Sequence, residues 1–381
     1  MQVNTGRQPL TANPAWTKRL CLLYVTDMNA QRAAMAMVVL TITFYILWWG
    51  KAMLIPLAIA ATILFLINIL SHSIHQLKIG SFRLPEALCF VVALVTILSA
   101  IGVTVNFFLQ NINGVISAAP GYQRNLEALI LRFSASFGIE EAVNIREMIR
   151  SINFSPFLFN LGRTVTTLVG NTVIIIVFLI FLIIEQRMMR PKLRALIRNN
   201  DEHEDALALI ARIRKDIRTY LGIKFLTSLM TGVLSYVVLK IVGVDFAGFW
   251  AILIFMLNFI PTLGSIVATI FPSLLALVQF ETLGPFVVTV IALTSIQICI
   301  GNLIEPRLMG NSLNISPIVI LLSLGLWGQI WDIPGMFLCV PITAIIMIIF
   351  SYFPSTRPLA VILSGSGEIL NTPRREREAG N

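Results

Sequence analysis

The chain has 381 residues, of which 57% are hydrophobic and only 12% are charged. About a quarter of the residues in a soluble domain are charged, so this composition excludes an ordinary soluble enzyme. Several charge-free runs reach the roughly 20 residues needed to cross the hydrocarbon core of a bilayer, and they lack the alternating polarity of barrel strands. The sequence therefore predicts an all-α, polytopic membrane protein with about seven or eight transmembrane segments.

The net charge of +9 has a simple explanation in such a protein. Lys and Arg gather in cytoplasmic loops and set the orientation of the chain, so we expect no nucleic acid partner. The four cysteines have no CxxC spacing, and the pair His72 and His75 has no further ligands beside it, so we expect no metal site or disulfide framework. There is no Walker A sequence, nucleophile elbow or HExxH motif. These absences argue against an enzyme and against a cofactor, and we assign no catalytic residue.

The first half of the chain divides by polarity. Residues 1–32 are polar and lack the apolar core of a secretion signal, so they are expected to form a cytoplasmic tail. Residues 33–110 are predicted to hold transmembrane helices 1 to 3. In residues 111–163 apolar positions recur at helical spacing among balanced charges, which predicts an extracytoplasmic helical domain. Residues 164–184 follow as transmembrane helix 4.

The second half begins with the most charged segment. Residues 185–218 are basic and have one apolar face, which predicts an amphipathic cytoplasmic helix. Residues 219–353 form the predicted C-terminal transmembrane core. Residues 354–381 are expected to be a disordered cytoplasmic tail.

Orientation follows from counting positive charges. With both termini inside, the expected cytoplasmic segments 1–32, 71–85, 185–224 and 354–381 hold 4, 2, 10 and 4 Lys or Arg, which is 20 of the 28 in the chain. The reverse topology would translocate those twenty, so both termini are predicted to be cytoplasmic.

Two apolar runs, 249–280 and 316–353, leave an alternative open. With about 32 and 38 residues they exceed one comfortable span, and each contains Pro and Gly. Each is either a single broken span or a re-entrant hairpin that turns at its Pro/Gly break. We favour hairpins entering from opposite faces, because Arg307 then joins the positive side.

The helix breaks select the candidate functional residues. Proline removes a backbone donor and glycine weakens a helix, and broken membrane helices often mark the substrate site of a transporter. Ionisable groups at membrane depth are costly and are usually functional, although Glu305 and Asp332 would be unremarkable if solvated at an interface. Asn258 and Asn302 are either ligands or hydrogen-bonding links between helices. The candidate residues of a solute pathway are Asn258, Pro261, Gly264, Ser265, Asn302, Glu305, Pro306, Gly310, Asp332, Pro334 and Gly335.

With these residues in view, the chain resembles the autoinducer-2 exporter (AI-2E) family of bacterial inner-membrane permeases. The resemblance is carried by Gly243-Val-Asp-Phe-Ala, Asn258-Phe-Ile-Pro261-x-x-Gly264, Gly301-Asn302-x-Ile-x-Pro306-x-x-x-Gly310, Ser316-Pro317, Pro334-Gly335-x-x-Leu338 and Pro341-Ile-Thr. It extends less distinctly over nearly the whole membrane region. Asp332 departs from the pattern, because the family has glycine there.

The resemblance implies a multi-pass protein of the cell inner membrane that works as a homo-oligomer, with a pentamer as the suggested form. It also implies export of the quorum-sensing furanone autoinducer-2, or exchange of Na⁺ or Li⁺ for protons. Together with the polar groups at the breaks, this favours a permease that exports a small, neutral, polar solute, with a proton or monovalent cation as a candidate coupling ion and Glu305 as its first candidate carrier. The alternatives are a Na⁺(Li⁺)/H⁺ antiporter, and a non-transporting scaffold or receptor that binds through residues 111–163.

Overall fold

The computed structural model describes residues 34–35, 37–76, 84–137, 166, 170–197, 200–280, 282–310 and 313–367. The chain divides into two compact units, Met1–Leu54 and Ile55–Asn381. The first unit contributes the apolar helix Met37–Trp49 and the first residues of α2. The expected tail 1–32 lies outside the described residues.

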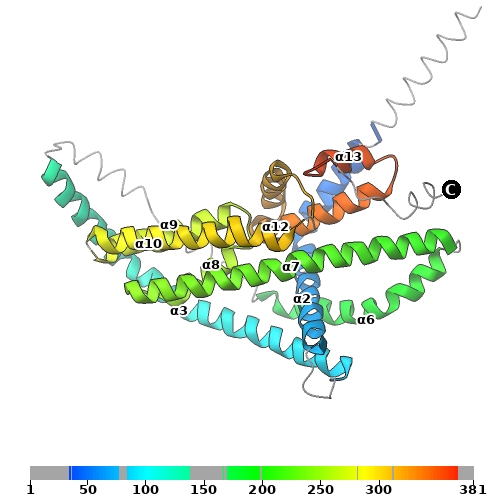
Figure 1. Ribbon diagram of the computed structural model, residues 1–381, viewed down its shortest axis with the longest axis horizontal. Helices are drawn as coiled ribbons and strands as arrows, with labels where there is room; N and C mark the ends of the chain where they lie inside the picture. The colour runs from blue at the N-terminus through cyan, green and yellow to red at the C-terminus, as the bar shows by residue number, and fades with distance from the viewer. Residues whose placement is uncertain are drawn as a thin grey trace, which may run out of the picture. The chain divides into compact units, whose positions relative to one another are not determined.

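Helices make up almost all of the described part of the second unit (Figure 1). Among the described residues, seven helices are long and apolar enough to cross a membrane, which confirms a polytopic helical membrane protein. In chain order the elements are α2 (Lys51–Gln76), α3 (Glu86–Phe137), α6 (Thr172–Leu196), α7 (Asn200–Val242), α8 (Ala247–Leu257), α9 (Leu263–Phe280), α10 (Leu283–Gln297), the π-helix η1 (Ile298–Ile304), α11 (Glu305–Met309), α12 (Pro317–Tyr352) and α13 (Arg357–Leu363).

The helices α2, α3 and α6 share one apolar cluster. Ala60, Leu64 and Ile67 of α2 pack with Ala93 of α3 and with α6. The small alanine side chains let helix backbones approach closely, which is how membrane helices associate without a hydrophobic driving force. A hydrogen bond of 3.0 Å from the Asn68 amide to the Gln186 side chain adds a polar link between α2 and α6.

The helix α3 continues well beyond the third predicted span. It runs unbroken for 52 residues to Phe137, and residues 138–163 of the expected extracytoplasmic domain lie outside the described residues. Tyr122 donates a hydrogen bond of 2.9 Å to Asp245, and the Asn125 amide donates one of 3.1 Å to the Val278 carbonyl. Burial, together with the neighbouring Asp245 carboxylate, raises the pKa of Tyr122 above its ordinary value, so the phenol remains a donor. The extension of α3 is thereby attached to the loop after α7 and to the end of α9.

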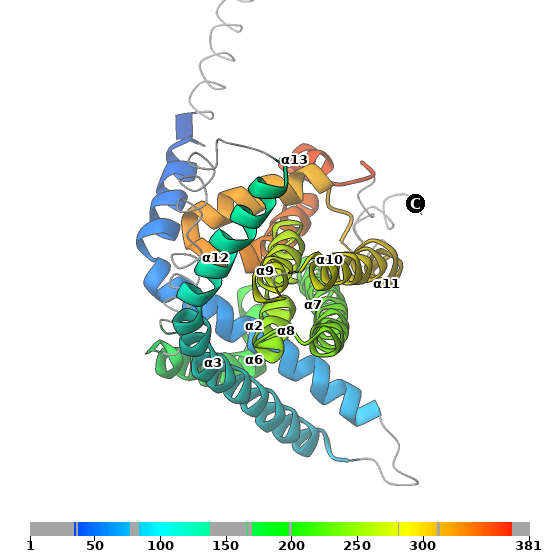
Figure 2. The same cartoon turned by 90° about the vertical axis from the view of Figure 1, so that its left-hand side faces the viewer.

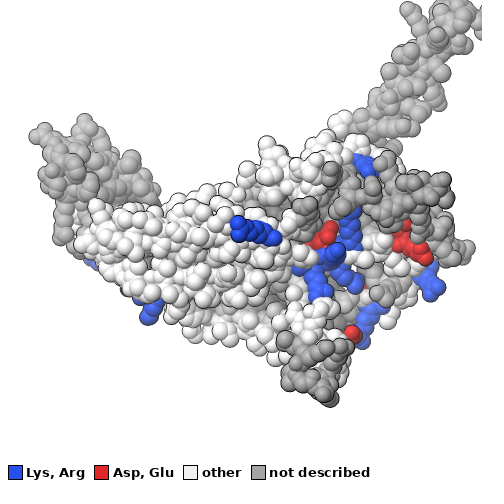
Figure 3. Space-filling view, viewed as in Figure 1, with Lys and Arg blue, Asp and Glu red and all other residues white. Residues whose placement is uncertain are grey.

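The charged part of the unit coincides with α6 and the beginning of α7. Lys192 pairs with Glu185 at 2.6 Å on α6, and Arg212 pairs with Asp216 at 3.7 Å on α7. On the face shown in Figure 3, charged side chains gather over this end, while the surface over α9 and α10 is largely uncharged.

The run 249–280 folds into a helical hairpin made of α8 and α9. The Gln279 side chain accepts a hydrogen bond of 2.7 Å from the Asp245 backbone and donates one of 2.9 Å to the Gly243 carbonyl. The start of α8 and the end of α9 therefore lie side by side, at the end of α7. The run is therefore a helical hairpin and not one continuous helix, and its entry into the membrane from one face stays a prediction.

The tip of this first hairpin, residues 258–264, depends on Gly264. A Cβ at Gly264 would lie 1.8 Å from the Leu257 carbonyl oxygen, so the backbone at the start of α9 is in contact with the end of α8. The backbone bonds are made locally, including Ile260 N–H to Leu257 O at 2.8 Å and Gly264 N–H to Ile260 O at 3.2 Å. A turn inside a bilayer requires such internal bonding, because no water is present to replace it.

The run 316–353 forms a second hairpin within α12. Trp331 and Asp332 have non-helical backbone angles and separate two helical arms. A Cβ at Gly335 would lie 1.9 Å from the Trp327 carbonyl oxygen, eight residues earlier, so the chain reverses there. At the other end the Ser316 N–H bonds to the Leu363 carbonyl at 3.0 Å, and Ile315 bridges to Ser364. The seven residues of α13 span only about 10 Å, so both arms begin and end at the same side.

The two hairpins open toward opposite ends of the bundle and their tips meet. The 27 residues 283–309 connect the root of one to the root of the other over about 40 Å. The outgoing arms, of 11 residues in α8 and about 14 in α12, cover about 16 and 21 Å of that length. The rings of Phe259 and Phe337 stack at 4.6 Å where the tips meet. Figure 2 shows α7, α8, α9 and α10 nearly end-on in one bundle.

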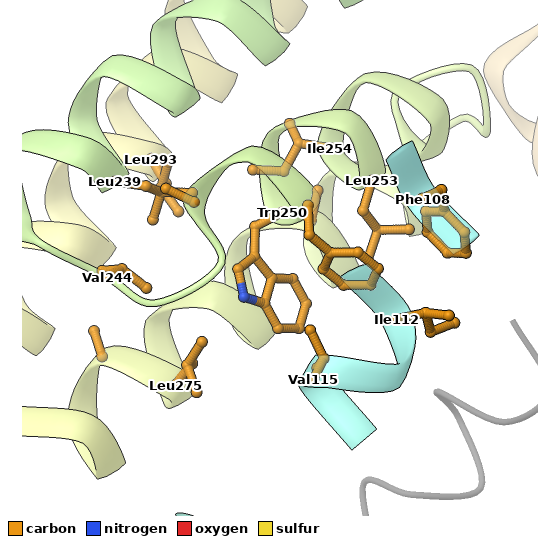
Figure 4. Close-up of a cluster of buried hydrophobic side chains, with 14 residues drawn as sticks. Phe108, Ile112, Val115, Leu239, Val244, Trp250, Leu253, Ile254, Leu275 and Leu293 are labelled. Atoms are coloured by element: carbon orange, nitrogen blue, oxygen red, sulfur yellow. The ribbon is translucent and has the colours of Figure 1, made fainter. Parts of the chain in front are cut away.

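The first hairpin is anchored in an extensive cluster of buried apolar side chains (Figure 4). Trp250, Leu253 and Ile254 of α8 pack against Phe108 of α3, and the cluster extends to Leu275 of α9. On its other side α8 lies close to α7, because α7 presents small residues. A Cβ at Gly232 would be 3.0 Å from the Phe255 Cβ, and Thr231 and Ser235 are almost fully buried.

The end of the chain differs from the expected disordered tail. The helix α13 begins at Arg357-Pro358, a favoured helix start, and buries Ala360 completely. The Asn314 side chain accepts a hydrogen bond of 3.1 Å from the Ser366 backbone. This segment is ordered because it closes the root of the second hairpin. Residues 368–381 lie outside the described residues.

Replacement of either tip glycine tests the two reversals. We expect Gly264→Ala and Gly335→Ala each to lower the free energy of unfolding by at least about 3 kcal/mol, since the new methyl group would overlap a backbone carbonyl. The matched controls are Gly284→Ala and Gly325→Ala, where the added Cβ meets no atom within 4 Å. These controls should change stability by less than about 1 kcal/mol. Thermal unfolding in nanodiscs measures all four, and equal losses in tip and control variants would contradict the hairpin tips.

Asp332 offers a second test, because its backbone lies where glycine is preferred. Its φ of 54° and ψ of −140° lie in a backbone region where residues other than glycine are strained, at a cost of about 1–3 kcal/mol. We expect Asp332→Gly to raise the free energy of unfolding by about 1 kcal/mol, and Asp332→Ala, which keeps the strain, to give no gain. A less stable glycine variant in the same unfolding assay would mean that contacts of the carboxylate outweigh the strain.

Candidate functional site

A cavity of about 860 Å³ lies beside the tip of the first hairpin. Its walls come from α7, from the tip and α9, from the continuous segment α10–η1–α11, and from Pro317, Ile320 and Val340 of the second hairpin. Its polar lining residues are Tyr220, Lys224, Asn258, Thr262, Ser265, Thr269, Thr294, Gln297, Asn302, Glu305 and Asn314. The cavity is therefore apolar in its walls, with amides, hydroxyls and two charged groups set into them.

The π-helix η1 supplies one whole wall, and Pro306 explains why it forms. Proline has no N–H, so in an α-helix the carbonyl four residues before it loses its partner and meets the ring. The Glu305 N–H instead bonds to the Ile300 carbonyl, five residues earlier. Gly301 and Asn302 favour helix formation weakly and so tolerate the wider turn. The wider turn brings Gln297, Gly301, Asn302 and Glu305 to the cavity.

Glu305 is held by two groups of α7. Its Oε1 lies 2.7 Å from the Lys224 Nζ, and its Oε2 accepts a hydrogen bond of 3.2 Å from the Thr227 hydroxyl. The Lys224 and Glu305 side chains are only 9% and 15% exposed. Charges removed from water to this extent need a partner, and here each is the partner of the other. The pair is the only one of opposite charge among the residues that line the cavity.

The two asparagines predicted from the sequence have different surroundings. Asn258 is buried and its amide donates a hydrogen bond of 3.1 Å to the Ser228 hydroxyl, which ties the tip of the first hairpin to α7. Asn302 is exposed to the cavity, and within the described part of the chain no hydrogen bond to its amide is made. The same holds for the Gln297 amide, which was not among the predicted site residues. These two amides are available to a bound molecule.

The structure brings together seven of the eleven residues predicted for the solute pathway. Those that line the cavity are Asn258, Pro261, Ser265, Asn302, Glu305, Pro306 and Gly310. Gly264 shapes the tip behind the wall, while Asp332, Pro334 and Gly335 form the second tip and do not line the cavity.

Lys224 is the main residue that the sequence interpretation missed. It was counted with the basic cytoplasmic segment, although it lies within the apolar half of α7. The available signal was a single lysine inside a predicted span, because such a charge requires a buried partner.

Comparison of the sequence with known proteins gives a family match over most of the chain. Residues 36–355 match the family described as AI-2E family transporter. A candidate transport protein of Borreliella burgdorferi is 30% identical over 327 residues, covering 84% of this chain and 87% of that protein. A second candidate transport protein, from Haemophilus influenzae, is 33% identical over 246 residues, covering 63% and 68% of the two chains.

One relative carries a more specific name. The AI-2 transport protein TqsA of Escherichia coli is 24% identical over 347 residues, covering 89% of this chain and 97% of that protein. The family match covers the hairpins, the π-helix and every residue that lines the cavity. The chain is a multi-pass inner-membrane protein that belongs to the AI-2E family of transporters.

Proposed function

We propose that the protein exports a small, neutral, polar solute through the cavity beside the first hairpin, with an autoinducer-2-like furanone as the best candidate. The name of the relative TqsA supports the choice of candidate. The observation that carries the proposal is the pair of unpartnered amides, Gln297 and Asn302, in a cavity whose two charges cancel. Amides donate and accept hydrogen bonds, which suits hydroxyl and carbonyl groups on an uncharged molecule.

The hairpins supply a route to alternating access. They open toward opposite ends of the bundle, and their tips are in contact through Phe259 and Phe337 beside the cavity. Movement of either tip would change the end of the bundle from which the cavity is reached. Broken helices near the middle of the membrane form the substrate sites of many transporters. With both termini cytoplasmic, the second hairpin would open inward and the first outward.

The antiporter alternative has less support from the geometry. A Na⁺ or Li⁺ site needs several oxygen ligands, and at depth a carboxylate among them. Glu305 is the only carboxylate that lines the cavity, and Lys224 and Thr227 already occupy its two oxygens. The driving force is therefore proposed to be the solute gradient, or a proton carried by Glu305 when its contact with Lys224 opens.

The assembly and the external domain complete the proposal. The protein would work as a homo-oligomer, and residues 111–163 would lie outside the cytoplasm, joined to the transport core through α3. The contacts of Tyr122 and Asn125 with the root of the first hairpin support a mechanical link between that extension and the hairpin. A scaffold or receptor without transport gives no account of the two unpartnered amides in the cavity.

Removal of the free amides tests the solute site. We expect Gln297→Leu and Asn302→Leu each to lower the initial rate of autoinducer-2 uptake into inverted vesicles by about tenfold, the equivalent of one lost hydrogen bond. Asn106→Leu on α3 is the matched control, because this amide lies outside the cavity and should leave the rate unchanged. Uptake that is absent from the wild type, or equal in all four proteins, would contradict the proposed function.

A further inference from the structure

The Lys224–Glu305 pair has a consequence for which solutes the cavity accepts. Both groups line the cavity and both are largely withdrawn from water. The third titratable residue in the lining, Tyr220, is a phenol and uncharged at neutral pH. The electrostatic character of the cavity is therefore set by whether this one pair is complete.

In this geometry both oxygens of the Glu305 carboxylate already have partners, so the carboxylate does not require a second cation. One carboxylate oxygen is 2.7 Å from the ammonium group and the other accepts a hydrogen bond from Thr227. A separate cation entering the cavity would have to displace a covalently tethered one. An anion would likewise have to displace the carboxylate from Lys224.

We propose that Lys224 is a specificity-determining residue, which makes the solute site electroneutral by acting as the counter-ion of Glu305. The inference rests on the proposed function, because it specifies the charge of the solute taken by the same cavity. Without the lysine charge, Glu305 becomes an unpaired carboxylate that recruits a small monovalent cation. Without the glutamate charge, Lys224 recruits a small anion.

The test uses ion and solute uptake by the full-length protein in proteoliposomes at pH 8, with radiolabelled Na⁺, radiolabelled Cl⁻ and autoinducer-2 as separate probes. The variants are Lys224→Met, Glu305→Gln and the double variant. Lys240→Met is the matched control, since Lys240 lies on the same helix and outside this cavity. Lys224→Arg keeps the charge and should therefore show no gain of Na⁺ uptake.

We expect Lys224→Met to raise Na⁺ uptake by at least about tenfold over the wild type, and Glu305→Gln to raise Cl⁻ uptake to a similar extent. The double variant should take up neither ion above the wild-type rate, because its cavity is neutral again. The two single variants are independent tests, so poor folding of one leaves the other decisive. Native yield by size-exclusion chromatography identifies such a failure.

The proposal is overturned if neither single variant gains ion uptake, if the double variant keeps the gain, or if Lys240→Met gains as much as Lys224→Met. Wild-type Na⁺ uptake that depends on Glu305 would also overturn it, in favour of an antiporter. The autoinducer-2 probe separates the two proposals. A wild type that ignores autoinducer-2 while the ion pattern holds refutes the substrate and leaves the role of Lys224 intact.

Discussion

The core of this protein depends on two places where the chain reverses within its apolar layer. A polypeptide turning in a bilayer must bond its own backbone groups, and it must do so in a space without room for side chains. Gly264 and Gly335 meet this constraint by direct approach to the carbonyls of Leu257 and Trp327. Because the chain turns back midway in each hairpin, the root of each hairpin lies at one end of the bundle and its tip lies near the tip of the other. The cavity exists because these helices stop halfway.

The lining of the cavity also depends on an interruption of regular α-helix. Pro306 forces a wider turn before it, and the resulting π-helix directs two free amides and one carboxylate to the same wall. The opposite wall, α7, uses small residues to admit α8 and supplies the one ammonium group that the carboxylate requires. The helix break before Pro306 thus positions Glu305, the packing of α7 positions Lys224, and the ion pair depends on both. The result is a cavity with apolar walls whose lining carries one positive and one negative charge.

Much of this organisation was predictable from the sequence. Continuous apolar runs established the membrane class, and the prolines and glycines located both hairpin tips and most of the cavity wall. The contacts between residues far apart in the sequence could not be predicted. Lys224 resembles any member of the preceding basic segment until α7 is seen packed against α11, where Glu305 lies 81 residues away in sequence. Likewise the helix break at Asp332, Pro334 and Gly335 predicts a place in the pathway, yet these residues form a hairpin tip and do not line the cavity. The ordered segment 357–367 was missed because its order comes from closing a hairpin root and not from its composition.

The most direct test of the central claim is solute protection of a cysteine placed in the cavity. Ser265 lines the cavity and Ser73 on α2 does not, so Ser265→Cys and Ser73→Cys, each in a background without native cysteines, form a matched pair. The rate of maleimide labelling is measured in nanodiscs with and without autoinducer-2. The account predicts that autoinducer-2 slows labelling at position 265 several-fold and leaves position 73 unchanged. Equal labelling at position 265 with and without the solute would contradict it.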